Sequence, residues 1–68
     1  MELQPHQQRV VDEKTELDKK ALALSQFIGL NPVFQTIDQQ EQQRLRWQCE
    51  IMWQYSEILG KRIKAFRG

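Results

Sequence analysis

Apolar residues recur at intervals of three and four along two long stretches of the chain, and this spacing constrains the fold more than any other feature. Residues at such intervals share one side of an α-helix, whereas a strand needs apolar and polar residues to alternate. Neither stretch alternates for long, so the spacing predicts an all-α chain. The first helix is expected from about residue 6 to residue 28, with this seam: Val10, Lys14, Leu17, Ala21, Leu24 and Ile28.

The link between the two stretches, residues 29–37, carries its own signals. Gly29 is a residue type that commonly ends a helix, so it marks the expected stop of the first helix. Asn31 followed by Pro32 is typical of the start of a helical turn, so one short turn is expected within the link. A link of this length favours two helices that fold back on each other.

The second helix is expected from about residue 38 to residue 66. Asp38 followed by Glu41 forms a capping-box pattern, and Thr36 followed by Gln39 is a second candidate. Together with the first helix, this predicts one antiparallel two-helix hairpin domain over residues 1–68.

The apolar face of the second helix is wider than one partner helix can cover. One arc is expected to face the first helix: Leu45, Cys49, Met52, Tyr55, Leu59, Ile63 and Phe66. A chain of 68 residues with one cysteine also has no internal disulfide to stabilise its small core. A contiguous apolar patch needs cover, and a second copy of the chain is the common solution. A homo-oligomer is therefore predicted, with a second apolar group as its interface: Trp47, Ile51, Ile58 and Ala65.

Composition narrows the classes of function. Ten Lys and Arg against nine Asp and Glu give a net charge of +1, which argues against broad binding to nucleic acid. Residues 61–67 carry four cations and no acid, but cations also stabilise the end of a helix. No run is apolar enough to span a membrane, and the start lacks the pattern of a signal peptide. With a single cysteine, these features favour the cytoplasm.

Motifs for catalysis and for metal or cofactor binding are not found in the sequence. It has no glycine-rich phosphate loop, no nucleophile elbow and no paired cysteines. His6 is interpreted as a solvated residue near the start, and Cys49 as a small core residue. The acidic residues of this stretch, Asp12, Glu13, Glu16 and Asp18, are interspersed with Lys14 and followed by two more lysines, and they are interpreted as a solvated surface. We therefore expect a binding protein rather than an enzyme, without a metal or cofactor.

Two features point to possible ligand contacts. Lys14 interrupts the apolar seam, where its ammonium group either reaches solvent or a carboxylate, or holds an anionic ligand. On the second helix, arginines bracket aromatic and aliphatic residues in one line: Arg44, Trp47, Ile51, Tyr55, Ile58 and Arg62. Aromatic rings with guanidinium groups suit a nucleotide, through stacking and phosphate contacts. The same residue types are also common anchors of protein interfaces, so both interpretations stay open.

The sequence resembles a widespread group of small bacteriophage proteins found in crAss-like and other phages and prophages. The resemblance covers roughly residues 8–66. It rests on RVVDEKTELDKKALALSQFI, on the later segments that begin at Phe34 and Gln48, and on specific polar positions: Glu13, Asp18, Lys20, Glu41, Gln42, Tyr55 and Arg62. The resemblance implies a phage origin and the cytoplasm of a host cell, and it carries over no catalytic residues.

Small helical-hairpin phage proteins that form oligomers include sponges for the cyclic-nucleotide or ADP-ribose-type messengers of bacterial immune systems such as CBASS and Thoeris. By this analogy of fold, the leading expectation is counter-defence by sequestration of a nucleotide messenger at subunit interfaces. The expected ligand contacts are Lys14, Arg44, Trp47, Tyr55 and Arg62. The alternative is a protein–protein module: an inhibitor or adaptor that binds a host protein, or a structural part of the phage.

Overall fold

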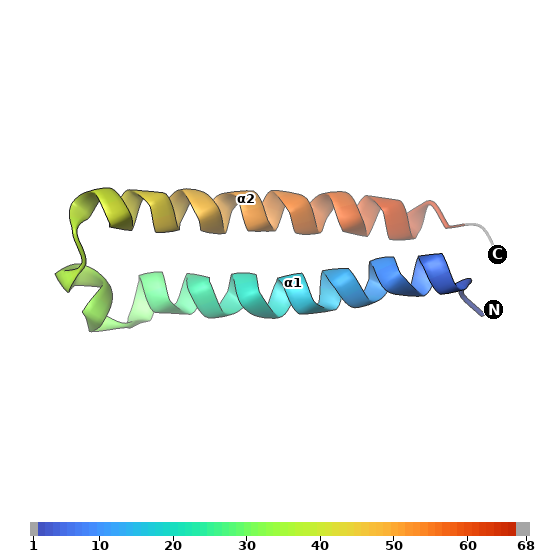
Figure 1. Ribbon diagram of the computed structural model, residues 1–68, viewed down its shortest axis with the longest axis horizontal. Coiled ribbons are helices and arrows are strands. Elements are labelled where there is room, and N and C mark those ends of the chain that lie inside the picture. The colour runs from blue at the N-terminus through green and yellow to red at the C-terminus, as the bar shows by residue number, and fades with distance from the viewer. Residues whose placement is uncertain (1, 67–68) are drawn as a thin grey trace.

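The computed structural model describes residues 2–66 as an antiparallel hairpin of two long helices (Figure 1). Helix α1 spans Pro5–Leu30, the short 3₁₀ helix η1 spans Pro32–Thr36, and α2 spans Gln39–Lys64. The molecule measures 49 × 15 × 14 Å, and the start of α1 and the end of α2 lie at the same end of the rod. The predicted all-α hairpin is confirmed, and no strand occurs within residues 2–66.

Helix α1 continues past the glycine that was expected to end it. Gly29 keeps a negative φ and lies inside the helix, so its prediction as the stop is wrong. The helix ends at Leu30 because Pro32 follows two residues later. The residue before a proline is pushed out of the α conformation, and Asn31 accordingly has φ −91° and ψ 119°. The backbone N–H of Asn31 still donates to the carbonyl of Phe27.

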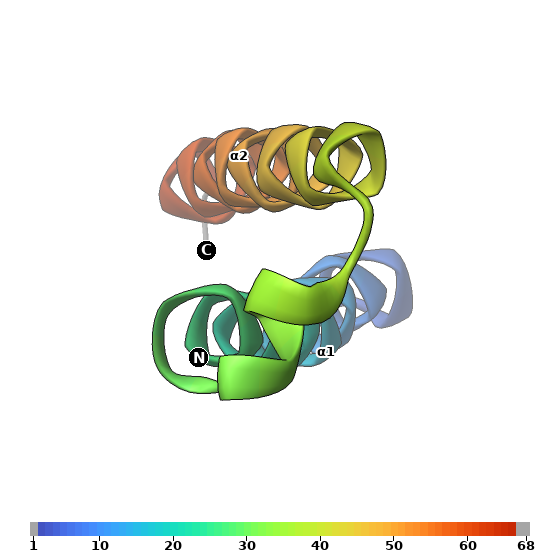
Figure 2. The same cartoon turned by 90° about the vertical axis from the view of Figure 1, so that its left-hand side faces the viewer.

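The connection folds into the short turn that the Asn31–Pro32 pair predicts. The side-chain oxygen of Asn31 accepts a hydrogen bond of 2.9 Å from the backbone N–H of Val33, which caps η1. Figure 2 shows η1 lying across the connected end of the hairpin, between α1 and α2. The turn is therefore an ordered cap on the helix pair and not a flexible linker.

Helix α2 begins at the predicted cap. The carboxylate of Asp38 accepts from the backbone N–H of Gln40 at 3.0 Å, which satisfies one free donor of the first turn. The side-chain amide of Gln42 then donates to the backbone carbonyls of Phe34 at 2.9 Å and Ile37 at 2.8 Å. These two bonds fasten η1 to the first turn of α2.

The core is a thin seam between the two helices, closed at one end by Phe34. Phe34 and Leu59 are fully buried, and Phe34 packs edge-to-face against Phe27 at 5.9 Å between ring centroids. The guanidinium group of Arg46 lies over the Phe34 ring, 5.0 Å from its centre. On α1, Val10 and Ala21 are buried, as the predicted seam requires.

The arc of α2 that faces α1 differs from the prediction at one position. Tyr55 was expected to face α1, but it is 41% exposed, while the neighbouring Ser56 is only 5% exposed. Ser56 takes the inward position because its hydroxyl forms hydrogen bonds with Lys14 and Asp18 across the seam. Cys49 and Leu59 are buried as expected, and these predicted members are half-buried: Leu45, Met52, Ile63 and Phe66.

Candidate binding surface on helix α2

A line of exposed side chains follows the side of α2 that faces away from α1. We call it the outer row: Arg44, Trp47, Ile51, Tyr55, Ile58 and Arg62. The exposed fractions of its large apolar side chains are high, at 66% for Trp47, 49% for Ile51 and 56% for Ile58. Ala65, just beyond the last residue of α2, is also exposed on this side. None of these four predicted interface residues is covered by α1.

A shallow hollow of about 310 Å³ opens at the Arg44 end of the outer row. Its lining comes from Arg44, Trp47, Gln48, Ile51 and Met52. The structure thus brings a flat indole ring and a guanidinium group to one small surface. Such a surface can stack a planar base and donate hydrogen bonds to an anion.

The guanidinium group of Arg44 is held by a neighbour on its own helix. Its Nε–H donates to Oε1 of Glu41 at 2.7 Å. An arginine carries five N–H donors, so this bond restricts the side chain and leaves its terminal donors for a ligand. The pair is exposed to solvent, so it contributes little to stability.

Arg62 lies at the same angular position on α2 as Arg44 but far along the helix. The two positions are 18 residues apart, which corresponds to about 27 Å along the axis. Tyr55 lies between them and is exposed. Within one chain, the outer row therefore presents two separated cationic ends and not one compact site.

Lys14 lies elsewhere, at one edge of the seam between the helices. Its Nζ contacts Oδ2 of Asp18 at 2.7 Å and Oγ of Ser56 at 3.0 Å. The Ser56 hydroxyl in turn donates to Oδ1 of Asp18. The Lys14 and Ser56 hydrogen bonds to the Asp18 carboxylate lower the pKa of Asp18 below its usual value of 3.8. Lys14 therefore meets a carboxylate within the hairpin, and the structure does not bring it together with the other four expected ligand contacts.

A second hollow lies at this edge, among residues that were not predicted to bind a ligand, apart from Lys14. Trp53 borders it with Lys14, Gly60, Lys61 and Lys64. Gly60 and Trp53 are seven residues apart, so the spacing of a tryptophan and a glycine on one helix face was the signal that could have found it. Its charge is partly balanced, because Glu57 borders it too and contacts Lys61 at 3.5 Å.

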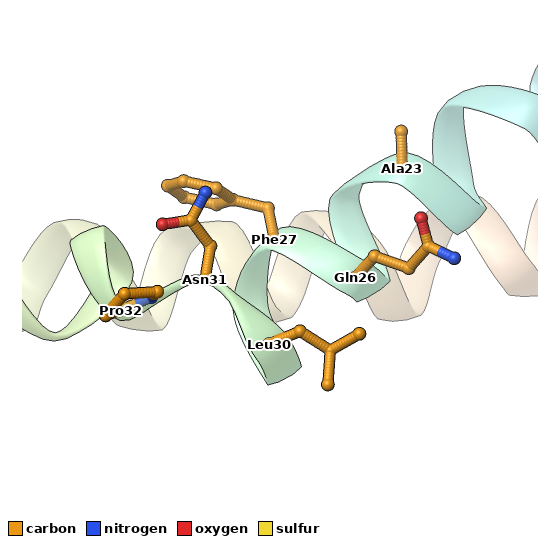
Figure 3. A pocket seen from close by; sticks show the side chains of 6 residues that line it. All are labelled: Ala23, Gln26, Phe27, Leu30, Asn31 and Pro32. Atoms are coloured by element: carbon orange, nitrogen blue, oxygen red, sulfur yellow. The ribbon is translucent and has the colours of Figure 1, made fainter.

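A third hollow lies where α1 meets η1 (Figure 3). No charged side chain lines it: its residues are Ala23, Gln26, Phe27, Leu30, Asn31 and Pro32. Figure 3 shows these side chains spread along the outer surface of the last turns of α1, without a common centre to which polar groups converge. This surface offers nothing specific to an anionic ligand.

Within residues 2–66, no group of three or more His, Cys, Asp or Glu side chains could hold a metal ion. Cys49 is buried against α1, with its Sγ 3.5 Å from Oγ of Ser25. Neither α1 nor α2 is long and apolar enough to cross a membrane. Of the basic segment 61–67, Arg67 lies outside the described residues.

Comparison with known protein families gives one match. The Sequestin family matches residues 4–65, and the chain belongs to this family. No curated protein and no solved structure matches the chain.

Proposed function

We propose that this member of the Sequestin family is a non-enzymatic phage or prophage protein that sequesters an immune second messenger of its bacterial host. The messenger is a cyclic nucleotide or a related ADP-ribose-type molecule, and binding takes place in the host cytoplasm at interfaces between subunits. The name of the family denotes holding a molecule rather than converting it, which agrees with the binding surface on α2.

The outer row is the observation that carries this proposal. A nucleotide messenger combines planar bases with phosphate groups, and each part needs a different partner. At the Arg44 end, Trp47 offers an exposed ring for stacking, and Arg44 offers donors for phosphate next to it. Arg62 and Tyr55 offer the same pair of chemistries further along α2. Stacking on an aromatic side chain contributes about 1–3 kcal/mol per base.

Oligomerisation completes the proposed binding site. A nucleotide held on one exposed helix face would stay largely in solvent, where contacts between charges are weak. A second copy of the chain would cover Trp47, Ile51 and Ile58 and would exclude water from the ligand. The same contact would supply the apolar burial that a single hairpin lacks.

The proposal is tested by native mass spectrometry of the purified protein, followed by titration calorimetry with 3′,3′-cyclic GMP–AMP, cyclic di-AMP and cyclic ADP-ribose. We expect a discrete oligomer that binds at least one of these molecules. Replacement Arg44→Ala or Arg62→Ala removes hydrogen bonds to a charged group, each of which contributes about 1.5–3 kcal/mol, so affinity should fall about 10-fold or more. Arg9→Ala is the matched control, because Arg9 is also exposed but lies on α1.

If Arg44→Ala and Arg62→Ala both bind the messenger as tightly as Arg9→Ala does, the outer row is not the ligand site. If none of the three nucleotides binds, sequestration of this class of messenger is wrong.

The second candidate function is a protein–protein module that inhibits or adapts a host protein or serves as a structural part of the phage. The exposed aliphatic and aromatic surface of α2 favours it, because Trp47, Ile51 and Ile58 are typical interface residues at high exposure. A stoichiometric complex with one host or phage protein, lost in Trp47→Ala and unaffected by nucleotides, would support this candidate over the first.

A further inference from the structure

The outer row cannot form one compact site within a single chain. Arg44 and Arg62 share one angular position on α2 but lie 18 residues apart, about 27 Å along a straight helix. Two guanidinium groups at that distance cannot contact the same phosphate. Either each arginine binds alone, or a second copy of the chain brings an Arg62 next to Arg44.

The order of residues in the outer row suggests how a second copy would do this. The row is nearly symmetric about residue 53, because Arg44 and Arg62 each lie nine residues from it and Ile51 and Tyr55 each lie two. Trp47 and Ile58 lie six and five residues away on opposite sides. Such a pattern is self-complementary when two helices run antiparallel across a two-fold axis.

We propose that two copies pack antiparallel along their outer rows about a two-fold axis near residue 53. Arg44 of one copy and Arg62 of the other then form one binding site for a phosphate or phosphodiester group, and each dimer holds two such sites. This inference rests on the proposed function, and it deepens that function by naming the subunit arrangement that builds the ligand site.

Side-chain geometry is consistent with a shared site. A two-fold axis perpendicular to both helices keeps Arg44 and Arg62 of the two copies on the same edge of the interface and at the same height. Packed helices lie about 8–10 Å apart, so two arginine side chains from facing helices can reach one group between them. Trp47 would face Ile58 of the second copy, which buries the two most exposed apolar side chains of the row.

The charges of the shared site also specify its ligand. Two guanidinium groups would repel each other, and Glu41, which already contacts Arg44 at 2.7 Å, balances only one of them. Each site then carries a net charge of about +1 before ligand binds. A phosphate or phosphodiester group is anionic, and bidentate contacts from arginine fit its oxygens.

The antiparallel pairing is tested by disulfide formation between Gln40→Cys and Ala65→Cys. Both positions are exposed, and within one chain they lie about 37 Å apart. In the proposed dimer, position 40 of one copy lies within one residue of the level of position 65 of the other, close enough for the 4.4–6.8 Å between Cα atoms that a disulfide needs. We expect a disulfide-linked dimer when the two variants are refolded together and oxidised.

Each variant alone, and the unmodified chain with its buried Cys49, should give no linked dimer. Linked dimers from Gln40→Cys alone and from Ala65→Cys alone would indicate parallel pairing and would overturn the inference. So would the lack of a linked dimer in the mixture.

The shared site is tested by mixing two inactive variants, with inorganic pyrophosphate as the probe. Arg44→Ala and Arg62→Ala should each weaken pyrophosphate binding about 10-fold or more. In a mixed dimer, one site loses both arginines and the other keeps both. Refolding the variants together in equal amounts should therefore restore wild-type affinity at about a quarter of the wild-type number of sites.

If the mixture binds no better than either variant, or if the wild type does not bind pyrophosphate, the shared site is wrong. The outcomes also separate this inference from the proposed function. Tight binding of a nucleotide messenger without the linked dimer would leave the function standing and remove the arrangement. The linked dimer with restored pyrophosphate binding, but without binding of any messenger, would support the arrangement and contradict the proposed function.

Discussion

At the scale of single residues, three polar side chains form a cluster in the seam between the helices: Lys14, Asp18 and Ser56. The ammonium group contacts both partners, and the Ser56 hydroxyl bonds to the remaining oxygen of Asp18. Lys14 and Asp18 come from α1 and Ser56 from α2, so these bonds join the two helices. A polar group at one position of an apolar seam fixes the register, because sliding either helix would take the buried Ser56 hydroxyl away from Lys14 and Asp18 and leave it unpaired.

Asp18→Asn tests this polar group through its pH dependence. The hydrogen bonds from Lys14 and Ser56 lower the pKa of Asp18 in the folded protein, so ionised Asp18 stabilises the fold. That stability is fully present above the pKa of the unfolded chain, about 3.9, and is lost as the pH falls through the folded pKa. We expect Asp18→Asn to reduce the free energy of unfolding by about 1 kcal/mol at pH 7, because the group is partly exposed.

The measurement is urea unfolding followed by circular dichroism at pH 7 and pH 3, with Asp12→Asn on the exposed side of α1 as the control. The difference between wild type and Asp18→Asn should shrink at pH 3. An equal difference at both pH values would show that the charge of Asp18 does not stabilise the fold.

Part of this polar group could be predicted from the sequence. The spacing of apolar residues placed Lys14 in the seam, and a carboxylate partner was one of two interpretations. Ser56 was missed, and Tyr55 was placed inward instead, because apolar character alone assigned residues to the buried arc. A buried hydroxyl is recognisable only once its partners on the other helix are known. The sequence of α2 alone does not show which of its residues lies opposite Lys14.

At the scale of elements, the ends of the helices depend on backbone chemistry that is partly readable. Asp38 and the Asn31–Pro32 pair were identified correctly, because capping residues act on their immediate neighbours. The prediction that Gly29 ends the first helix was wrong, because glycine is common after the end of a helix but can also lie within one. In this chain Pro32 ends α1, and Gly29 stays helical with a negative φ.

Gly29→Ala tests this correction. A Cβ at position 29 would meet no atom within 4 Å, and the backbone is already helical. Alanine restricts the unfolded chain more than glycine, so the free energy of unfolding should rise by about 1 kcal/mol. Thermal unfolding by circular dichroism measures the change. A loss of stability would mean that Gly29 needs a left-handed conformation.

Gly60→Ala provides the comparison, because a Cβ there would lie 3.4 Å from Cε of Lys14. Position 60 is also helical, so the replacement of glycine by alanine restricts the unfolded backbone to the same degree in both variants. The gain at position 60 should be smaller than at position 29, because the Lys14 side chain must accommodate the new methyl group.

At the scale of the whole molecule, the hairpin is short of buried surface. A chain of this size is marginal as a single core, and within residues 2–66 the hydrophobic side chains that become fully buried are few: Phe34, Leu59 and Ala21. Large apolar side chains stay exposed on α2 at the same time, with Trp47 at 66%. The sequence indicated this imbalance through the width of the apolar face, but no local pattern in the sequence identifies a partner for this face.

Ile58→Lys tests whether a second copy provides this cover. Ile58 belongs to the outer row and is 56% exposed in the single chain, and Leu22 on α1 is exposed to a similar degree, at 51%. A charge at a buried interface is costly, whereas the same change on a free surface is nearly neutral. The melting temperature of an oligomer rises with protein concentration, because subunit association stabilises the folded state. We therefore expect the melting temperature to rise with protein concentration for the wild type and for Leu22→Lys. For Ile58→Lys we expect no such rise, and we expect this variant to sediment as a monomer in sedimentation velocity. A wild type that sediments as a monomer, or two lysine variants that behave alike, would leave the outer row without a role in self-association.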